Sequence, residues 1–247
     1  MRRLNCPVRS IENYNHDTRR VLLEIPEEPG NKMAFKAGQY LEMVLPGKNY
    51  PFSIASSPDY KDVIELHIRP TPDSEDSLEV EALLDSGVKH IQIEFPKGDC
   101  IIEEAPPNPL ILLAAGTGVT QMNSIIEFLL PRGMSHPVHL YWGVLADKDL
   151  YLDERYHELV ERHDNFHYTA VVSEPDSSPR WKGRTGLVPH AVLEDFEDLA
   201  DVTVYVGGGP VMVYATLDAF MARGLPEDRM FSDVFSYAPR SQQADRE

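Results

Sequence analysis

The sequence predicts two domains, an N-terminal antiparallel β-barrel with one helix followed by an α/β domain with a doubly wound parallel sheet. Up to residue 104 the chain has several short strand patterns, one helical pattern and no strand–helix–strand rhythm, whereas beyond residue 108 strands and helices alternate. A proline-rich segment at 103–109 separates the halves, and prolines disfavour helix interiors and central strands. We therefore expect domains at 1–104 and 108–238, followed by a disordered polar tail at 239–247.

The first half reads as β because short runs of β-branched and aliphatic residues are separated by turn signals. We predict strands at residues 5–11, 18–25, 39–45, 63–69 and 90–95. In the strand at 63–69 apolar and polar residues alternate, which places Ile64, Leu66 and Ile68 on one face and His67 on the other. This alternation is typical of a strand with one buried face.

One helix interrupts the first half. Asp76 and Glu79 have the spacing of a capping box, and Gly87 is placed to end the helix. The predicted apolar face consists of Leu78, Ala82 and Leu83.

In the second half we predict strands at 110–114, 138–142, 166–172 and 202–206, and helices at 121–130, 152–163, 189–196 and 211–223. Alternating strands and helices form parallel sheets with right-handed crossovers, and such sheets bind ligands beyond the carboxyl ends of their strands. Glycines follow three of these strands, in Gly116-Thr117-Gly118, Trp142-Gly143 and Gly207-Gly208-Gly209-Pro210. Three glycine-bearing strand ends in one sheet favour a nucleotide site.

The strand end at Gly116 has the features of a pyrophosphate site. Gly116 and Gly118 permit a tight turn and a close ligand approach, and the N–H groups of the following helix would point at an anion. The motif is incomplete, because Gln121 stands where the dinucleotide-binding fingerprint has its third glycine. On its own it is equally compatible with a strand-to-helix turn without a ligand.

Composition limits the possible partners. The net charge of −17 argues against nucleic acid, whose phosphates would be repelled. No apolar run is long enough to cross a bilayer and the N-terminus lacks a signal-peptide core, so we expect a cytoplasmic protein without a membrane partner. Two cysteines, Cys6 and Cys100, are too few for a disulfide framework or a four-thiolate cluster, and we predict no metal site.

The order of barrel, linker and parallel domain resembles the ferredoxin–NADP reductase superfamily. More narrowly, the chain is similar to the bacterial NAD(P)H:flavin reductases, including those that supply reduced flavin to luciferases. The blocks that carry the resemblance are YPFSIASSP at 50–58, IELHI at 64–68, the Gly116 region, WKGRTG at 181–186 and RMFSDVF at 229–235. They extend over nearly the whole chain.

The resemblance implies a role for each block. Pro51-Phe52-Ser53 would lie under the flavin ring with the Ser53 hydroxyl near N5, where a hydroxyl can donate or accept as the protonation of that nitrogen changes. Ser53 and Asp233 are the predicted catalytic residues. The predicted flavin-side residues are Tyr50, Pro51, Phe52, Ser53, His67, Ile68, Arg69 and Phe235. The predicted nicotinamide-side residues are Gly116, Thr117, Gly118, Trp142, Gly143, Gly207, Gly208, Pro210 and Met212.

Simpler roles stay open for some of these residues. Ser53 would also suit the end of a strand, His67 and Asp233 would suit a solvated surface, and Trp181 would suit a core. The chain also departs from the family. Many relatives have a cysteine in the segment that reads Gly207-Gly208-Gly209 here.

The phosphate side departs further. Tyr50 stands where relatives often have an arginine that pairs with the flavin phosphate, and residues 71–77 are acidic where a phosphate-binding segment is usual. Arg69 is the candidate replacement cation, unless it is simply exposed to solvent.

The function implied is transfer of hydride from NADH or NADPH to N5 of a dissociable flavin, which is riboflavin, FMN or FAD. Reduced flavin would then pass to oxygen or to a flavin-dependent monooxygenase or luciferase. Two alternatives stay open: a reductase with tightly bound FAD and a protein acceptor such as a ferredoxin or an oxygenase, and a nucleotide-binding module without turnover. No base follows Trp142-Gly143 until Lys148, so we expect NADH to be used at least as well as NADPH.

Overall fold

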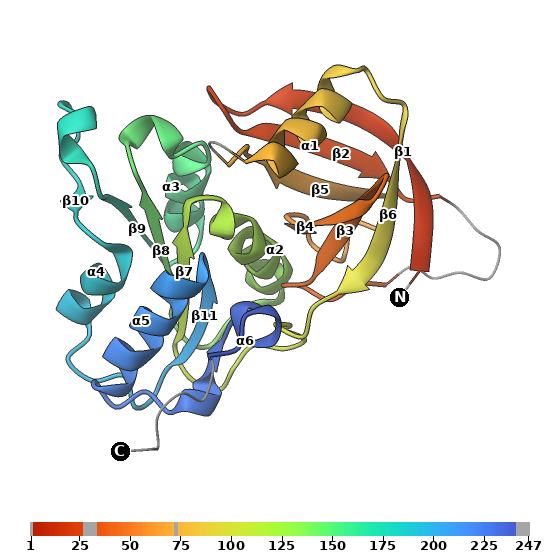
Figure 1. Ribbon diagram of the computed structural model, residues 1–247. Helices are drawn as coiled ribbons and strands as arrows, with labels where there is room; N and C mark the ends of the chain where they lie inside the picture. The colour runs from red at the N-terminus through yellow and green to blue at the C-terminus, as the bar shows by residue number, and fades with distance from the viewer. Residues whose placement is uncertain (1, 27–33, 72–73, 241–247) are drawn as a thin grey trace, which may run out of the picture.

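The computed structural model describes residues 2–26, 34–71 and 74–240, and Figure 1 shows two units side by side. Within these ranges the first unit is a six-stranded antiparallel half-barrel with one helix, and the second is a six-stranded parallel sheet between helices. This confirms the predicted fold class. The domain limits at 104 and 108 remain a prediction.

The half-barrel has the strand order β4-β3-β6-β1-β2-β5, and its core is built by alternation. The strands are β1 (Arg2–Asn13), β2 (Arg19–Glu24), β3 (Tyr40–Leu45), β4 (Lys48–Ser53), β5 (Val63–Ile68) and β6 (His90–Lys97). Leu66 on β5 lies opposite Val21 on β2, and both side chains are fully buried. Such cross-strand apolar pairs fix the register, because a slip of one residue would turn the apolar face to solvent.

Strand β4 was not predicted from the sequence. It contains Pro51, which has no N–H to give to a ladder, and proline disfavours a central strand. The structure places β4 at the edge of the sheet, paired only with β3, where a missing donor is tolerated. As a result Pro51, Phe52 and Ser53 lie at an edge that faces the second unit.

The helix of the half-barrel is α1 (Glu75–Asp85), and two predictions about it fail wholly or in part. No side chain caps its start, because Asp76 pairs with Lys48 and Glu79 accepts a hydrogen bond from the Tyr50 hydroxyl. Of the predicted apolar face, Leu83 packs against the core, whereas Leu78 and Ala82 are exposed and the fully buried residues are Val80 and Leu84. The predicted end near Gly87 is confirmed, since the helix stops at Asp85 and Gly87 has a φ of 70°.

The parallel sheet has the order β10-β9-β8-β7-β11-β12. Its strands are β7 (Leu110–Ala115), β8 (Val138–Val144), β9 (Phe166–Val172), β10 (Arg184–Thr185), β11 (Thr203–Gly207) and β12 (Met230–Phe231), of which the short edge strands β10 and β12 were not predicted. Helices are α2 (Val119–Leu129), α3 (Asp153–Arg162), α4 (Val188–Asp195), α5 (Pro210–Met221) and the short, unpredicted α6 (Val234–Tyr237).

Strand β7 is buried on both faces, as its unbroken apolar run predicted. Leu110, Leu112 and Ala114 pack into the core that contains residues of α2 and α3. Ile111 and Leu113 pack into the opposite core, which contains residues of α4 and α5. The carboxyl end of β7 is therefore packed on both faces, and this packing fixes the position of the Gly116 turn that follows it.

Helix α2 joins the two units. Figure 1 shows it between the parallel sheet and the half-barrel. Asn123 donates to the backbone oxygen of Ala55 at 3.0 Å, and Ser124 donates to that of Ser56 at 2.8 Å. Buried polar side chains of this kind are stable because their hydrogen bonds are made across the interface.

Among the described helices, none combines the length and apolarity needed to span a bilayer. Residues 239 and 240 are the only described part of the predicted tail, and Arg240 pairs with Asp218 on α5.

Candidate functional site

A cleft of about 580 Å³ lies between the half-barrel and the carboxyl edge of the parallel sheet. Its half-barrel wall consists of Tyr40, Glu42, Pro51, Phe52, Ser53, His67, Arg69 and Thr71. Its other wall consists of Ala115, Thr117, Gly118, Thr120, Gln121, Val206, Gly207, Gly208, Gly209, Ser232, Asp233, Val234 and Tyr237. Both walls carry residues that the sequence singled out, so the two units complete one site together.

Ten of the predicted residues line this cleft: Pro51, Phe52, Ser53, His67, Arg69, Thr117, Gly118, Gly207, Gly208 and Asp233. The other predicted residues do not, namely Tyr50, Ile68, Gly116, Trp142, Gly143, Pro210, Met212 and Phe235. Tyr50 and Ile68 line a smaller neighbouring pocket of about 220 Å³, which also contacts Pro51, Phe52 and Arg69.

The strand ends of β7 and β11 meet through two glycines. A Cβ on Gly118 would lie 2.2 Å from the Gly207 oxygen, and a Cβ on Gly207 would lie 2.6 Å from the Gly118 oxygen. These distances are far inside van der Waals contact, so the two backbones approach closely only because neither residue has a side chain. A cysteine cannot stand at position 207 in this arrangement. The cleft floor here is bare backbone.

Trp142 supports the cleft from behind. Its side chain is fully buried, and its Nε1 donates to the Gly116 oxygen at 2.8 Å, at the turn Gly116–Gly118. Gly143 is packed against Val188, since a Cβ there would lie 2.7 Å from the Val188 Cβ. These two residues shape the strand end and do not line the cleft.

Met212 and Phe235 also pack away from the cleft lining. The Met212 Cε lies 2.1 Å from where a Cβ on Gly208 would be, so Met212 covers the outer side of that glycine. The Phe235 ring lies 5.6 Å from the Tyr214 ring and packs on the α5 side. In the cleft its place near the C-terminus is taken by Tyr237.

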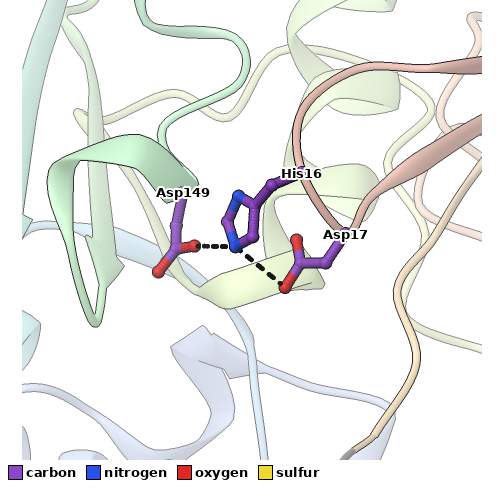
Figure 2. A group of neighbouring side chains, drawn as sticks. All are labelled: His16, Asp17 and Asp149. Atoms are coloured by element: carbon purple, nitrogen blue, oxygen red, sulfur yellow. Dashed lines mark ion pairs between the residues drawn. The ribbon is translucent and has the colours of Figure 1, made fainter.

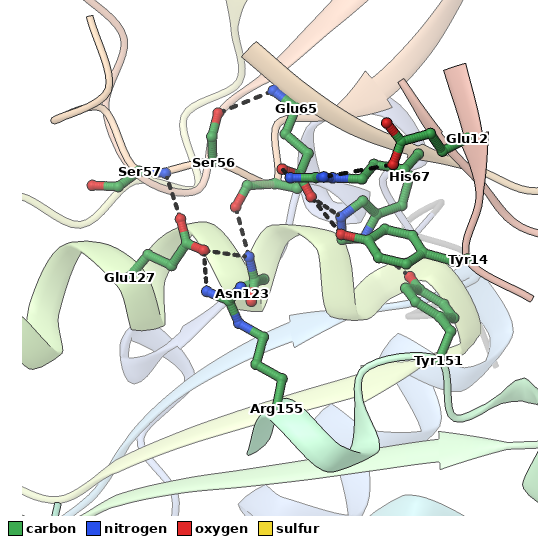
Figure 3. Close-up of polar contacts among 12 residues, drawn as sticks. Glu12, Tyr14, Ser56, Ser57, Glu65, His67, Asn123, Glu127, Tyr151 and Arg155 are labelled. Carbon is green, nitrogen blue, oxygen red and sulfur yellow. Dashed lines mark hydrogen bonds and ion pairs between the residues drawn. The ribbon is translucent and has the colours of Figure 1, made fainter. Parts of the chain in front are cut away.

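His67 is buried in the interface and is not a surface residue. Its Nε2 lies 3.0 Å from Glu65 Oε1 and its Nδ1 lies 3.2 Å from the Tyr151 hydroxyl, as Figure 3 shows. Burial lowers the pKa of His67, against the opposing effect of Glu65. Tyr14 and Arg20 also donate to Glu65. The polar face of β5 is thus covered by the second unit.

Glu65 is the charged centre of this group. Burial alone would raise its pKa, but hydrogen bonds from His67, Arg20 and Tyr14 outweigh that effect and hold the pKa well below the ordinary value of a glutamate. A neutral His67 and an ionised Glu65 form a stable wall behind the cleft.

Asp233 has the opposite environment. Its carboxyl precedes α6 on the cleft wall, and burial raises its pKa to about 6, against the opposing effect of a hydrogen bond from Gln121. Oδ2 accepts that bond at 2.8 Å, whereas the buried Oδ1 has no hydrogen-bond partner among the described residues. A carboxyl that titrates near neutral pH in a cleft is typical of proton-handling sites.

The end of the cleft near Arg69 is acidic. The Arg69 guanidinium donates to Asp17 at 2.7 Å and to Asp149 at 3.3 Å. His16 Nε2 lies 3.4 Å from Asp17 and 3.5 Å from Asp149, and Figure 2 shows the imidazole between the two carboxylates. The single cation lining the described part of this end is therefore already paired with two carboxylates.

The smaller pocket continues this acidic end. Asp76 and Glu81 line it, and the Tyr50 hydroxyl is directed to Glu79 on α1. Residues 72 and 73 of the acidic segment lie outside the described residues. A phosphate placed here would meet carboxylates before it met a free cation.

Sequence reasoning missed Tyr40, Gln121 and Tyr237 on the cleft wall. Gln121 was visible only as a departure from the glycine fingerprint, and its 3% exposed fraction on a polar side chain appears only in the folded structure. Tyr40 begins β3 beside Ser53, a pairing that depends on the unpredicted strand β4.

Comparisons with known proteins agree with this geometry. The chain matches the model of an oxidoreductase FAD-binding domain over residues 5–101 and of an oxidoreductase NAD-binding domain over residues 112–218. It is 35% identical over 240 residues to the NAD(P)H-flavin reductase of Vibrio harveyi, which covers 95% of this chain and 99% of that protein.

Two further relatives point to other acceptors. The chain is 36% identical to the CDP-6-deoxy-L-threo-D-glycero-4-hexulose-3-dehydrase reductase of Yersinia pestis, over 93% of this chain and 68% of that protein. The crystal structure of the Amycolatopsis cytochrome P450 reductase GcoB superposes with a TM-score of 0.82 at 31% identity, over 94% of this chain and 69% of that chain.

The residues of the cleft fit a flavin and a nicotinamide nucleotide. Glycine backbone at Gly118, Gly207 and Gly208 lines one wall, and Ser53 and Asp233 bring polar side chains to the same cleft. A bound flavin supplies the hydride-accepting chemistry, and the protein supplies binding and orientation. The chain therefore belongs to the ferredoxin–NADP reductase-like family of FAD- and NAD-binding oxidoreductases and is an NAD(P)H-dependent oxidoreductase of the flavin reductase type.

Proposed function

We propose that this protein is an NAD(P)H:flavin oxidoreductase that transfers hydride to N5 of a dissociable flavin, which it then releases in reduced form. The observation that carries the proposal is the acidic end of the cleft around Arg69 and Tyr50, which we call the phosphate end because a flavin phosphate would lie there. Arg69 is paired with Asp17 and Asp149, and the Tyr50 hydroxyl donates a hydrogen bond to Glu79. No described residue at this end leaves a cation free for a flavin phosphate.

The energetic consequence is weak retention of flavin. A pyrophosphate gripped by a cation and a ring held by stacking would support nanomolar binding, whereas ring contacts and the polar groups around the ribityl chain alone support micromolar binding. The difference is about 4 kcal/mol. Phosphate oxygens beside carboxylates also lose hydration without gaining partners.

In this proposal Ser53 and Asp233 act at the opposite end of the cleft, which we call the ring end because the flavin ring would lie there between Ser53, Gly207 and Asp233. Ser53 ends β4 opposite Tyr40 and lines the cleft, where its hydroxyl would meet N5 of a bound flavin. Asp233 would handle a proton beside the ring, which suits its pKa of about 6. Gly207 and Gly208 would hold the nicotinamide, and Thr117 and Gly118 would hold the pyrophosphate of NAD(P)H.

For the pyridine nucleotide we propose NADH use at least equal to NADPH use. Arg184, one of three bases near the end of β9, donates to the Ala191 oxygen and pairs with Asp195. That leaves Arg180 and Lys182, both exposed, for an extra phosphate. The ratio of the two specificity constants at fixed flavin tests this, and a strong NADPH preference would contradict it.

A second candidate is a reductase with fixed FAD and a protein acceptor. Its support is the similarity to the Yersinia reductase and to the P450 reductase GcoB, whose names give them partners other than free flavin. In the first candidate the reduced flavin goes to oxygen or to a separate monooxygenase or luciferase.

One experiment separates the candidates. The purified protein is passed through a desalting column, its visible spectrum is recorded, and NAD(P)H oxidation is measured with and without riboflavin, FMN and FAD. We expect a largely colourless protein whose activity depends on added flavin, with riboflavin or FMN used at least as well as FAD. A stoichiometric flavin that survives the column would support the second candidate instead.

A further inference from the structure

Gln121 connects three segments that are distant in the sequence. Its Nε2 donates to the Gly38 oxygen of the half-barrel at 2.7 Å and to Asp233 Oδ2 at 2.8 Å. Gln121 itself lies in the first turns of α2 and is only 3% exposed. One amide thus joins the half-barrel, the interface helix and the C-terminal segment at the ring end of the cleft.

We propose that Gln121 is a positioning residue that holds the Asp233 carboxyl in the cleft. The inference deepens the proposed function and rests on it for the use made of the carboxyl. Both protons of the Gln121 amide nitrogen are committed, one to a backbone oxygen that cannot move and one to Asp233. Oδ2 is therefore held by Gln121, and the buried Oδ1, which has no hydrogen-bond partner among the described residues and lies beside Gly98, is the oxygen left to carry a proton.

The groups around Asp233 make Gln121 the principal side-chain donor. Asp99, whose charge raises the pKa of Asp233, and the buried thiol of Cys100 face it from the segment after β6. Tyr40 faces it from β3 and Tyr237 from α6, and the charge of Asp233 raises the pKa of both phenols. None of these groups is a cation. The Gln121 amide and, to a lesser extent, the backbone N–H of Cys100 thus oppose burial in favouring the ionised carboxylate, and Gln121 is the side chain that does so.

A matched set of variants tests the role. Gln121→Met keeps the length of the side chain and removes the donor, and Gln121→Glu keeps its shape and removes the donor when ionised. Ser124→Ala is the control, because Ser124 makes the same kind of bond from α2 to the half-barrel, to the Ser56 oxygen, without touching Asp233. Asp233→Asn identifies the Asp233 signal by its loss.

The readout is the ¹³C NMR titration of the aspartate carboxyl carbons in protein without added cofactor. We expect the Asp233 midpoint near pH 6 in the wild type, unchanged in Ser124→Ala, and raised by about one pH unit in Gln121→Met because a donor to the ionised form is lost. Gln121→Glu raises it further through like charge. The pH profile of flavin-dependent NADH oxidation should move in the same direction.

A Gln121→Met or Gln121→Glu midpoint equal to that of the wild type would overturn the proposal, and if one variant fails to fold the other decides. Absence of flavin-dependent NADH oxidation in the wild type would instead refute the proposed function, while the titration would still report on Gln121. A shifted titration with an unmoved activity profile would contradict the part of the proposal that gives Asp233 a role in turnover.

Discussion

The two ends of the cleft are built on opposite principles. At the ring end, the cleft is lined by glycine backbone at Gly118 and Gly207, which pack closely against each other, and by the side chains of Ser53 and Asp233. At the phosphate end, Arg69 and Tyr50 are already bound to carboxylates of the same chain. In the proposed function, the flavin is therefore recognised by its ring, and a flavin phosphate adds little affinity.

The largest effect is expected from a substitution at the close contact between Gly118 and Gly207, at the ring end of the cleft. Gly118→Ala places a Cβ 2.2 Å from the Gly207 oxygen, so β7 and β11 must separate. We expect the free energy of unfolding to fall by about 3 kcal/mol or more and NADH binding to be lost. Urea unfolding and NADH titration measure both.

The matched control for Gly118→Ala is Gly209→Ala. A Cβ there has open space around it, and its φ of −73° is ordinary for alanine. It should leave the free energy of unfolding nearly unchanged, and it is a control for stability alone because Gly209 also lines the cleft. Equal losses of stability in the two variants would show that the close approach of Gly118 and Gly207 has no special importance.

The second prediction concerns the loss of folding stability that an ionised, buried Asp233 causes at the same end of the cleft. Its folded pKa of about 6 exceeds the ordinary value of 3.8, so the folded state binds the proton more tightly than the unfolded state. The group costs almost no stability below pH 3.8, the cost grows as the pH rises from 3.8 to about 6, and above that it stays at its full value. Asp233→Asn should therefore increase the free energy of unfolding by about 3 kcal/mol at pH 8 and by about half that at pH 5.

Asp59→Asn provides a control of opposite sign. Arg132 lowers the pKa of Asp59, so this carboxylate stabilises the fold at neutral pH, modestly because it is half exposed. Urea unfolding at both pH values compares the two variants. A gain at pH 8 in both, or in neither, would contradict the assignment.

The third prediction concerns Ser53. If its hydroxyl serves hydride arrival at N5, Ser53→Ala should lower kcat by up to about a hundredfold, by analogy with loss of one preorganised donor. Riboflavin affinity should change much less, because ring contacts with Pro51 and Phe52 remain. Steady-state kinetics and fluorescence titration separate the two effects, and an unchanged kcat would remove Ser53 from the mechanism.

The same contrast shows what sequence alone could predict. The apolar run of β7 and its terminal glycines predicted a buried strand with a ligand-binding end, because periodicity and glycine have direct backbone consequences. His67 was placed correctly on the polar face of β5, but that face is covered by the second unit, and a single-strand pattern does not distinguish solvent from a neighbouring polar surface.

Side-chain partners were the least predictable feature. Asp76 and Glu79 have capping spacing, yet they bind Lys48 and Tyr50 because α1 packs over β4. Trp142 lies near the carboxyl end of β8, where a ligand contact would be expected, yet it is buried and donates to the backbone at the Gly116 turn. Gln121 was noticed only for the glycine it replaces. Each outcome depends on contacts between segments far apart in the chain, which no local pattern encodes.

The smallest expected effect tests the phosphate end. Asp149→Asn removes a nearly buried negative charge 3.3 Å from the Arg69 guanidinium, while its remaining oxygen still accepts from the Ala146 N–H. Arg69 then keeps only Asp17 as a carboxylate partner and gains freedom to meet a phosphate. We expect the affinity for FMN relative to riboflavin to rise about fivefold, which corresponds to about 1 kcal/mol.

Asp59→Asn is the control. It breaks another ion pair between the two units, the more exposed one with Arg132, away from the cleft, so it should leave the ratio of FMN to riboflavin affinity unchanged. Fluorescence titration of both flavins at low and high salt measures the ratio, and high salt should reduce the gain of Asp149→Asn because a freed charge is screened. If the ratio stays constant in Asp149→Asn, pairing of Arg69 is not what makes the phosphate end unreceptive. The carboxylates of Asp76 and Glu81 on α1 would then be the stronger cause, because they line the pocket whether or not Arg69 is free.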